Sequence, residues 1–240
     1  MIQHKHFRVA VLITAALAAS GCSVFKRGKR PATPVLGERI PVLTTENDVQ
    51  VDPATSALPM SLPAEVANTM WAQSGGNASK SMGQLALGKA LGQAWSANAG
   101  RGSSLTARLA AEPIVAGDRV YVIDTLGAVR AFDAQAGTLI WASQTPFDER
   151  TNTPSLYGGG IAYDGGRIYA TNGVGYVAAL DARTGGIVWK VRPGGPLRGA
   201  PTVANGTVYV MSQDNQIYSL KEADGSQNWS QAASLEIAGV

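Results

Sequence analysis

The chain has 240 residues, of which 45% are hydrophobic and 15% are charged, with one cysteine and two histidines. Six of its 20 basic residues lie within the first 30 positions, whereas all 17 acidic residues follow, so the remainder has no basic surplus for binding nucleic acid. Both histidines, His4 and His6, precede the cysteine, which excludes Ser-His-Asp and Cys-His catalysis and zinc sites built from these residues in the remainder of the chain.

Residues 1–21 are typical of a secretory signal peptide. Lys5 and Arg8 precede an apolar run over residues 9–19, and a run of about 11 residues is too short to span a membrane. Residues 19–22 read Ala-Ser-Gly-Cys, which resembles the bacterial lipobox and implies acylation of Cys22. Ser23 at the next position implies release to the outer membrane, with the protein body in the periplasm. The alternative is an ordinary signal peptide followed by a chance cysteine.

Residues 22–65 predict a lipidated N-terminus followed by a flexible tether. This stretch contains six prolines and no sustained apolar periodicity, which is typical of a linker. Four basic residues cluster at positions 26–30. They either lie against anionic lipid headgroups beside the anchor or are simply solvated.

From residue 66 to the end, the sequence repeats itself with a period of 40 to 48 residues. Four tryptophans mark the period, at Trp95, Trp141, Trp189 and Trp229. Three tyrosines, Tyr121, Tyr169 and Tyr209, repeat in step with the last three tryptophans. Repeats of this length indicate an array of similar supersecondary units, and we place them near 111–146, 158–196 and 198–233.

Each repeat predicts a blade of four antiparallel strands. In the first repeat the strands are expected near 112–116, 119–124, 127–133 and 138–144, joined by turns at Gly117, Gly127 and Gly137. Such a sheet has two apolar faces and cannot cover both alone. The sequence therefore predicts an all-β fold, a β-propeller of four-stranded antiparallel blades with about three complete blades in this chain.

A shared block at the end of each repeat supplies the structural residues. It carries a glycine four residues before the tryptophan and, in two repeats, an aspartate four residues before the glycine. We expect the aspartates to bond the following turn, and the tryptophans to wedge between blades rather than stack on a ligand. These residues are Asp133, Asp181, Gly137, Gly185, Gly225 and the four tryptophans.

The block resembles the repeat of the quinoprotein alcohol-dehydrogenase-like propellers, which is shared by pyrroloquinoline-quinone enzymes and by the BamB family of outer-membrane assembly lipoproteins. Together with the lipobox, the tether and the block Trp-Ala-Gln-Ser-Gly-Gly-Asn at 71–77, the chain is similar to BamB of an alphaproteobacterial type. The resemblance implies an eight-bladed scaffold, so that this chain is expected to be an N-terminal piece of a longer protein. It also implies binding to a BamA-like barrel insertase, to the other lipoproteins of the assembly complex and, by analogy, to unfolded barrel proteins.

In that family, a loop after the last strand of a blade contacts BamA through a Leu-x-Leu-Arg-Gly pattern. By order of repeats, the matching apolar residues are Leu235 and Ile237, although alanine stands where the arginine is expected. A second candidate pair is Leu197 and Arg198, which come one blade earlier, before a strand expected to begin at Ala200. Their alternative role is a turn between blades.

Two other functions share the same fold. A quinone-dependent dehydrogenase of this family carries a vicinal cysteine pair, which this chain lacks. A propeller that binds a small ligand in its central funnel is the other alternative. Because no residues are arranged for catalysis, we expect no catalytic residue, no cofactor and no metal site.

Overall fold

A computed structural model of the chain describes residues 52–146 and 159–233. The chain divides into two units, residues 1–59 and residues 60–240. The described part of the first unit contains one short helix, α2 (Pro53–Ser56), which Asp52 caps by accepting a hydrogen bond from the Ala54 backbone N–H. No helix within the described ranges is long and apolar enough to cross a membrane.

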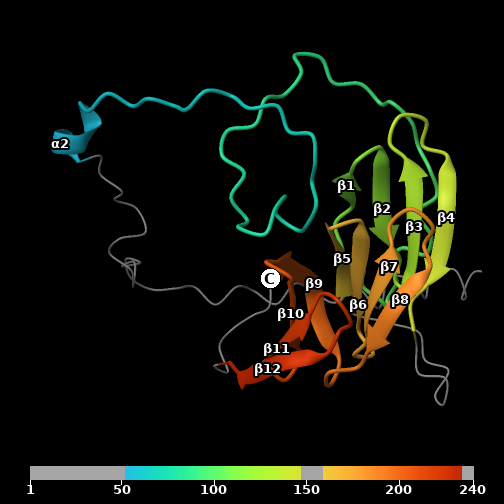
Figure 1. Cartoon of the computed structure of the whole chain (residues 1–240). Helices are drawn as coiled ribbons and strands as arrows, with labels where there is room; N and C mark the ends of the chain where they lie inside the picture. The colour runs from blue at the N-terminus through green and yellow to red at the C-terminus, as the bar shows by residue number, and fades with distance from the viewer. Residues whose placement is uncertain (1–51, 147–158, 234–240) are drawn as a thin grey trace, which may run out of the picture. The chain divides into compact units, whose positions relative to one another are not determined.

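The second unit contains three antiparallel sheets of four strands each, as Figure 1 shows. Each sheet is built from four consecutive strands, which pair in chain order as one blade. Blade 1 comprises β1 (Ile114–Ala116), β2 (Arg119–Ile123), β3 (Ala128–Asp133) and β4 (Leu139–Gln144). Blade 2 comprises β5 (Gly159–Asp164), β6 (Arg167–Asn172), β7 (Val177–Asp181) and β8 (Ile187–Val191). Blade 3 comprises β9 (Leu197–Ala204), β10 (Thr207–Ser212), β11 (Gln216–Lys221) and β12 (Gln227–Ala232).

The turns within blade 1 form where the sequence places glycines. Gly117, Gly127 and Gly137 have φ angles of 58°, 79° and 68°, a backbone conformation that other residues adopt only with strain. Blade 3 uses asparagine at two of its turns, Asn205 and Asn215, with φ of 52° and 59°. These turns allow consecutive strands to pair directly, and the expected four-stranded antiparallel blade is confirmed.

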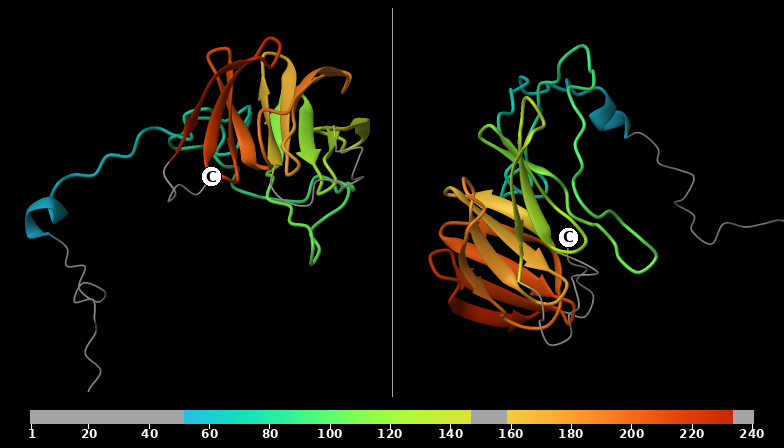
Figure 2. Two further views of the ribbon diagram at one scale, coloured as in Figure 1. Left: turned by 90° about the horizontal axis from the view of Figure 1, so that it is seen from below. Right: turned by 90° about the vertical axis from the view of Figure 1, so that its right-hand side faces the viewer.

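The hydrophobic core lies between the blades. One cluster joins blades 1 and 2, and a second joins blades 2 and 3. The side chains of β6 alternate between them, because Ile168 belongs to the first cluster and Tyr169 to the second. In both views of Figure 2, blade 2 lies between blades 1 and 3. The blades thus stack as the sequence predicts, and both faces of blade 2 are covered.

A segment ahead of the first blade crosses the inner strands of all three blades. Trp71 exchanges two backbone hydrogen bonds of 2.8 Å with Val115 in β1, and the Ala72 carbonyl accepts a bond from the Tyr163 backbone N–H in β5. Gln73 is 3% exposed, and its side-chain amide donates to the Val203 carbonyl of β9 at 2.7 Å and accepts from the Val203 N–H at 3.0 Å. This segment therefore fixes the three blades relative to one another.

One local expectation is wrong. β9 begins at Leu197 rather than at Ala200, because residues 197 and 198 pair with Ser212 and Met211 of β10 ahead of a register shift. Trp95, the first tryptophan of the repeat period, lies outside the strands of the blades. The indole nitrogen of Trp95 instead donates to the Ala134 carbonyl of blade 1 at 2.9 Å.

Candidate functional site

A tryptophan packs against a glycine turn in the same way at both seams between the described blades and where Trp95 meets blade 1. A Cβ atom added to the glycine would lie 2.6 to 2.7 Å from the indole ring, so only glycine leaves room for the tryptophan. The indole N–H donates to the carbonyl three residues before that glycine, at 2.9 to 3.1 Å. The pairs are Trp95 with Gly137 and Ala134, Trp141 with Gly185 and Ala182, and Trp189 with Gly225 and Glu222.

Aspartates shape two of these turns, as expected from the sequence. The Asp133 carboxylate accepts the backbone N–H groups of the residues two and three positions later at 2.9 and 2.7 Å. Asp181 repeats this at 3.0 and 2.7 Å, and its pKa lies below the usual range, because the hydroxyl and backbone N–H of Thr184 bond the carboxylate. The bonded turns hold in place the carbonyls that the tryptophans reach.

Arginines reinforce both seams between the described blades at a position that sequence reasoning missed. Arg119 of blade 1 donates through Nη1 to the carbonyls of Ala182 and Arg183 at 2.7 and 2.8 Å. Arg167 of blade 2 donates in the same way to the carbonyls of residues 222 and 223 at 2.9 and 3.2 Å. The recurrence of an arginine two residues before each seam tyrosine was the signal in the sequence.

The tyrosines of the two seams have different partners. The Tyr121 hydroxyl donates to the Ala182 carbonyl at 3.2 Å. The Tyr169 hydroxyl donates instead to the Glu222 side chain at 2.8 Å. Burial raises the pKa of Tyr121, and burial together with the Glu222 carboxylate raises the pKa of Tyr169. Burial and the same carboxylate raise the pKa of Asp164.

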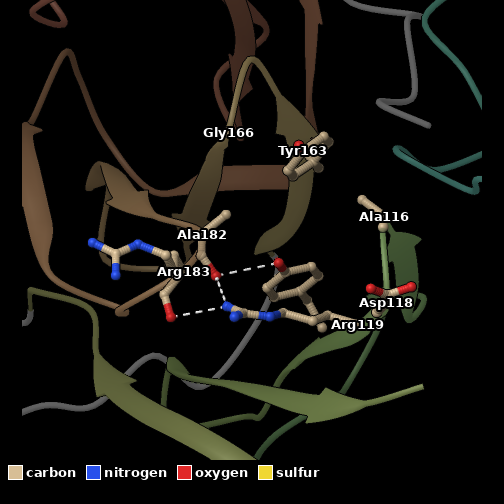
Figure 3. A pocket seen from close by; sticks show the side chains of 9 residues that line it. Ala116, Asp118, Arg119, Tyr163, Gly166, Ala182 and Arg183 are labelled. Atoms are coloured by element: carbon tan, nitrogen blue, oxygen red, sulfur yellow. Dashed lines mark hydrogen bonds between the residues drawn. The ribbon is translucent and has the colours of Figure 1, made fainter. Parts of the chain in front are cut away.

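A pocket of about 250 Å³ lies at the seam between blades 1 and 2. It is smaller than the sites of drug-sized ligands, which start at about 300 Å³. Figure 3 shows its lining, in which the Arg119 guanidinium reaches across to the carbonyls of Ala182 and Arg183. The lining residues are Ala116, Gly117, Asp118, Arg119, Tyr121, Tyr163, Gly166, Ala182 and Arg183.

The outer face of blade 3 carries the same aromatic pair as the two seams. The rings of Tyr209 and Trp229 are 6.1 Å apart and tilted by 49°, against 5.9 Å and 48° for Tyr121 and Trp141. Trp229 is 45% exposed. Tyr209 and Trp229 therefore have the same ring arrangement as the aromatic pairs of the two seams, but Trp229 is exposed.

The residues expected to bind a partner are placed as follows. Leu235 and Ile237 lie outside the described residues, as does the lipidation candidate Cys22. Leu197 is fully buried in the core between blades 2 and 3, which argues against its expected contact with a partner. Arg198 lies in β9 and donates to the Gln213 carbonyl at 3.1 Å.

Within residues 52–146 and 159–233, no group of three His, Cys, Asp or Glu side chains is placed to hold a metal ion. The repeated aspartates bond their own turns, and the seam arginines bond carbonyls of the next blade. The polar residues that repeat from blade to blade therefore hold the propeller together. The two seams differ in the partner of the tyrosine hydroxyl, and the pocket lies at the seam between blades 1 and 2.

A family model described as outer membrane protein assembly factor BamB matches residues 65–156 and 127–240. The chain is 30% identical over 137 residues to the outer membrane protein assembly factor BamB of Burkholderia pseudomallei, covering 57% of this chain and 32% of that protein. It is 31% identical over 134 residues to the BamB protein of Moranella endobia, covering 53% and 34%. The chain thus spans about a third of the length of the curated relatives it matches.

Among solved structures, the chain is similar to the quinohemoprotein alcohol dehydrogenase of Comamonas testosteroni. The TM-score is 0.56 at 25% sequence identity, over 68% of this chain and 27% of that one. This similarity shows the propeller fold. It does not separate an assembly factor from an enzyme, because one fold hosts both.

Proposed function

Because the chain belongs to the family of the outer membrane protein assembly factor BamB, we propose that it is a non-enzymatic scaffold lipoprotein of the outer-membrane β-barrel assembly complex. It binds the periplasmic domains of a BamA-like insertase and assists the insertion of barrel proteins. The family match over residues 65–240, which covers all three blades, carries this proposal.

The seam geometry supports a scaffold. Both described seams combine a packed tryptophan, its indole hydrogen bond, a glycine turn and an arginine that bonds two carbonyls of the next blade. Hydrogen bonds to charged groups contribute about 1.5–3 kcal/mol each. Such seams keep the blades from moving relative to one another, which presents the connecting loops to a partner at little entropic cost.

The lipid anchor and the partner loop complete the proposal. Acylation of Cys22 would hold the protein on the periplasmic face of the outer membrane, and residues 23–65 would let the propeller reach its partner. Leu235 and Ile237 would contact the insertase from the loop after blade 3. Replacing both with serine in the full-length protein should then weaken insertase binding at least tenfold, and an unchanged affinity would reject this loop as the contact.

Genetic depletion tests the function. Removal of the protein should lower the amount of folded barrel proteins in the outer membrane, while the amounts of unrelated outer-membrane lipoproteins stay constant. Restoration by the wild-type gene is the control. Barrel levels that do not change on depletion would contradict the proposal.

A quinone-dependent dehydrogenase is the second candidate, favoured by the fold similarity to a quinohemoprotein alcohol dehydrogenase. In such enzymes the cofactor performs the chemistry and the protein positions it. A purified full-length protein with a quinone absorption band and alcohol-dependent dye reduction would establish that function. A band without turnover would favour the third alternative, a propeller that binds a ligand in its funnel.

A further inference from the structure

We propose that the pocket between blades 1 and 2 is a binding site for the carboxylate of an acidic side chain that a partner protein presents. This inference rests on a comparison of the two seams within the chain and is independent of the identity of the insertase.

The two seams differ at the residue that follows the repeated turn position 181 or 221. Blade 2 has Ala182 there, and blade 3 has Glu222. Both residues offer their carbonyl to the tryptophan and the arginine of the preceding blade. Glu222 also turns its carboxylate back into the seam, where Oε1 accepts the Tyr169 hydroxyl at 2.8 Å. The chain itself therefore shows that this position in a seam accommodates a carboxylate.

The space that the Glu222 carboxylate fills is free of protein atoms in the first seam. A Cβ added to Gly165 would meet Oε1 of Glu222 at 3.3 Å, whereas a Cβ added to the matching Gly117 would meet no atom within 4 Å. Gly117 lines the pocket, and so does Ala182. The pocket therefore corresponds to the missing side chain of residue 182.

The first seam lacks the half-buried aspartate that faces the Glu222 carboxylate in the second seam. Asp164 faces Glu222 in the second seam and has a raised pKa, caused by its burial and by that carboxylate. Its counterpart in the first seam is Ala116, which carries no charge. Arg119 lines the pocket and reaches across it, and a guanidinium–carboxylate contact forms strong, charge-assisted hydrogen bonds.

The pocket is accessible from solvent. Gly117, Gly166 and Arg183 are exposed at its edge, and the Tyr163 ring forms one wall, stacked on Tyr121 at 6.4 Å. Asp118 is exposed at the same edge and opposes an anion. The aromatic wall and the small volume suit a single side chain on an extended segment.

Calorimetric titration of the full-length protein with two blocked tripeptides, acetyl-Gly-Glu-Gly-amide and acetyl-Gly-Gln-Gly-amide, tests the proposal. Because a charge-assisted contact is worth about 1.5–3 kcal/mol, the glutamate peptide should bind at least about tenfold more tightly than the glutamine peptide. The preference should shrink as salt is added. Equal affinities of the two peptides would overturn the proposal.

Two matched variants locate the binding. Ala182→Glu supplies the carboxylate from within the chain and should abolish binding of the glutamate peptide. Ala134→Glu makes the same change at the same repeat position of blade 1, which adjoins Trp95 instead of the pocket, and should leave binding unchanged. Asp118→Asn should strengthen it. Binding that survives Ala182→Glu, or that Asp118→Asn weakens, would show that the carboxylate does not occupy this pocket.

Discussion

The indole ring of Trp141 occupies the space in which a side chain at Gly185 would stand. A Cβ atom on Gly185 would lie 2.6 Å from Cε3 of Trp141, and the glycine has a φ of 76°. The Trp141 ring can therefore pack here only because residue 185, which is 44 positions away in the sequence, is a glycine. Because the same relationship joins Trp189 to Gly225, the repeat encodes the contact between blades as well as each blade.

Gly185→Ala should therefore destabilise the protein by about 2–4 kcal/mol, since it combines backbone strain with overpacking against Trp141. Gly206→Ala is the matched control, because Gly206 has a φ of 74° and a Cβ there would meet no atom within 4 Å. Urea unfolding measures both. If Gly185→Ala lowers the free energy of unfolding by no more than Gly206→Ala does, the tryptophan contact does not constrain the turn.

Gln73→Ala should lower the free energy of unfolding by about 2–3 kcal/mol, because it leaves the buried N–H and C=O of Val203 without their partner. Hydrogen exchange of the Val203 amide should accelerate. Gln135→Ala, at an exposed turn of blade 1, is the control and should change neither quantity by much. If the two variants behave alike, residues 71–76 do not fix the blades.

Asp164→Asn should alter the pH dependence of stability. The folded-state pKa of Asp164 is raised by burial and by Glu222, so between the ordinary carboxyl value near 3.9 and the raised value the folded protein holds more protons than the unfolded chain. Stability contributed by this group is therefore lost as pH rises through that window. Asparagine does not ionise, so the variant does not lose this stability as pH rises. It should have a higher melting temperature than wild type at pH 7, and the difference in melting temperature should shrink towards pH 4.

Asp214→Asn, on an exposed turn of blade 3, controls for the removal of one negative charge. Thermal unfolding of the three proteins across pH 4–7 makes the comparison. An Asp164→Asn protein with a lower melting temperature than wild type at pH 7 would contradict the assigned direction of the Asp164 pKa shift.

The blades were predictable because their signal is local and repeated. Turn glycines such as Gly117 mark the ends of the strands, and the spacing of Trp141 and Trp189 gives the length of the repeat. A weak signal in one repeat is supported by the same signal in the other two. The blade fold and the stacking of the blades followed directly.

The site was less predictable because it depends on differences between repeats and on distant pairs. The Gln73 side chain forms hydrogen bonds with the Val203 backbone, 130 positions away, and no local sequence pattern predicts such a contact. Ala182 stands out only beside Glu222, once both are known to face the preceding blade. Leu197 was expected in a turn before the strand, but it begins β9 and is buried between blades 2 and 3, because it pairs with Ser212 beyond a register shift that the sequence does not reveal.

The scaffold role is tested most directly by purifying the tagged full-length protein from its native outer membrane in mild detergent and identifying the proteins that co-elute in stoichiometric amounts. An untagged strain supplies the background. We expect recovery of a BamA-like barrel insertase together with companion lipoproteins. Recovery of the protein without any barrel insertase, and with a bound quinone instead, would contradict it.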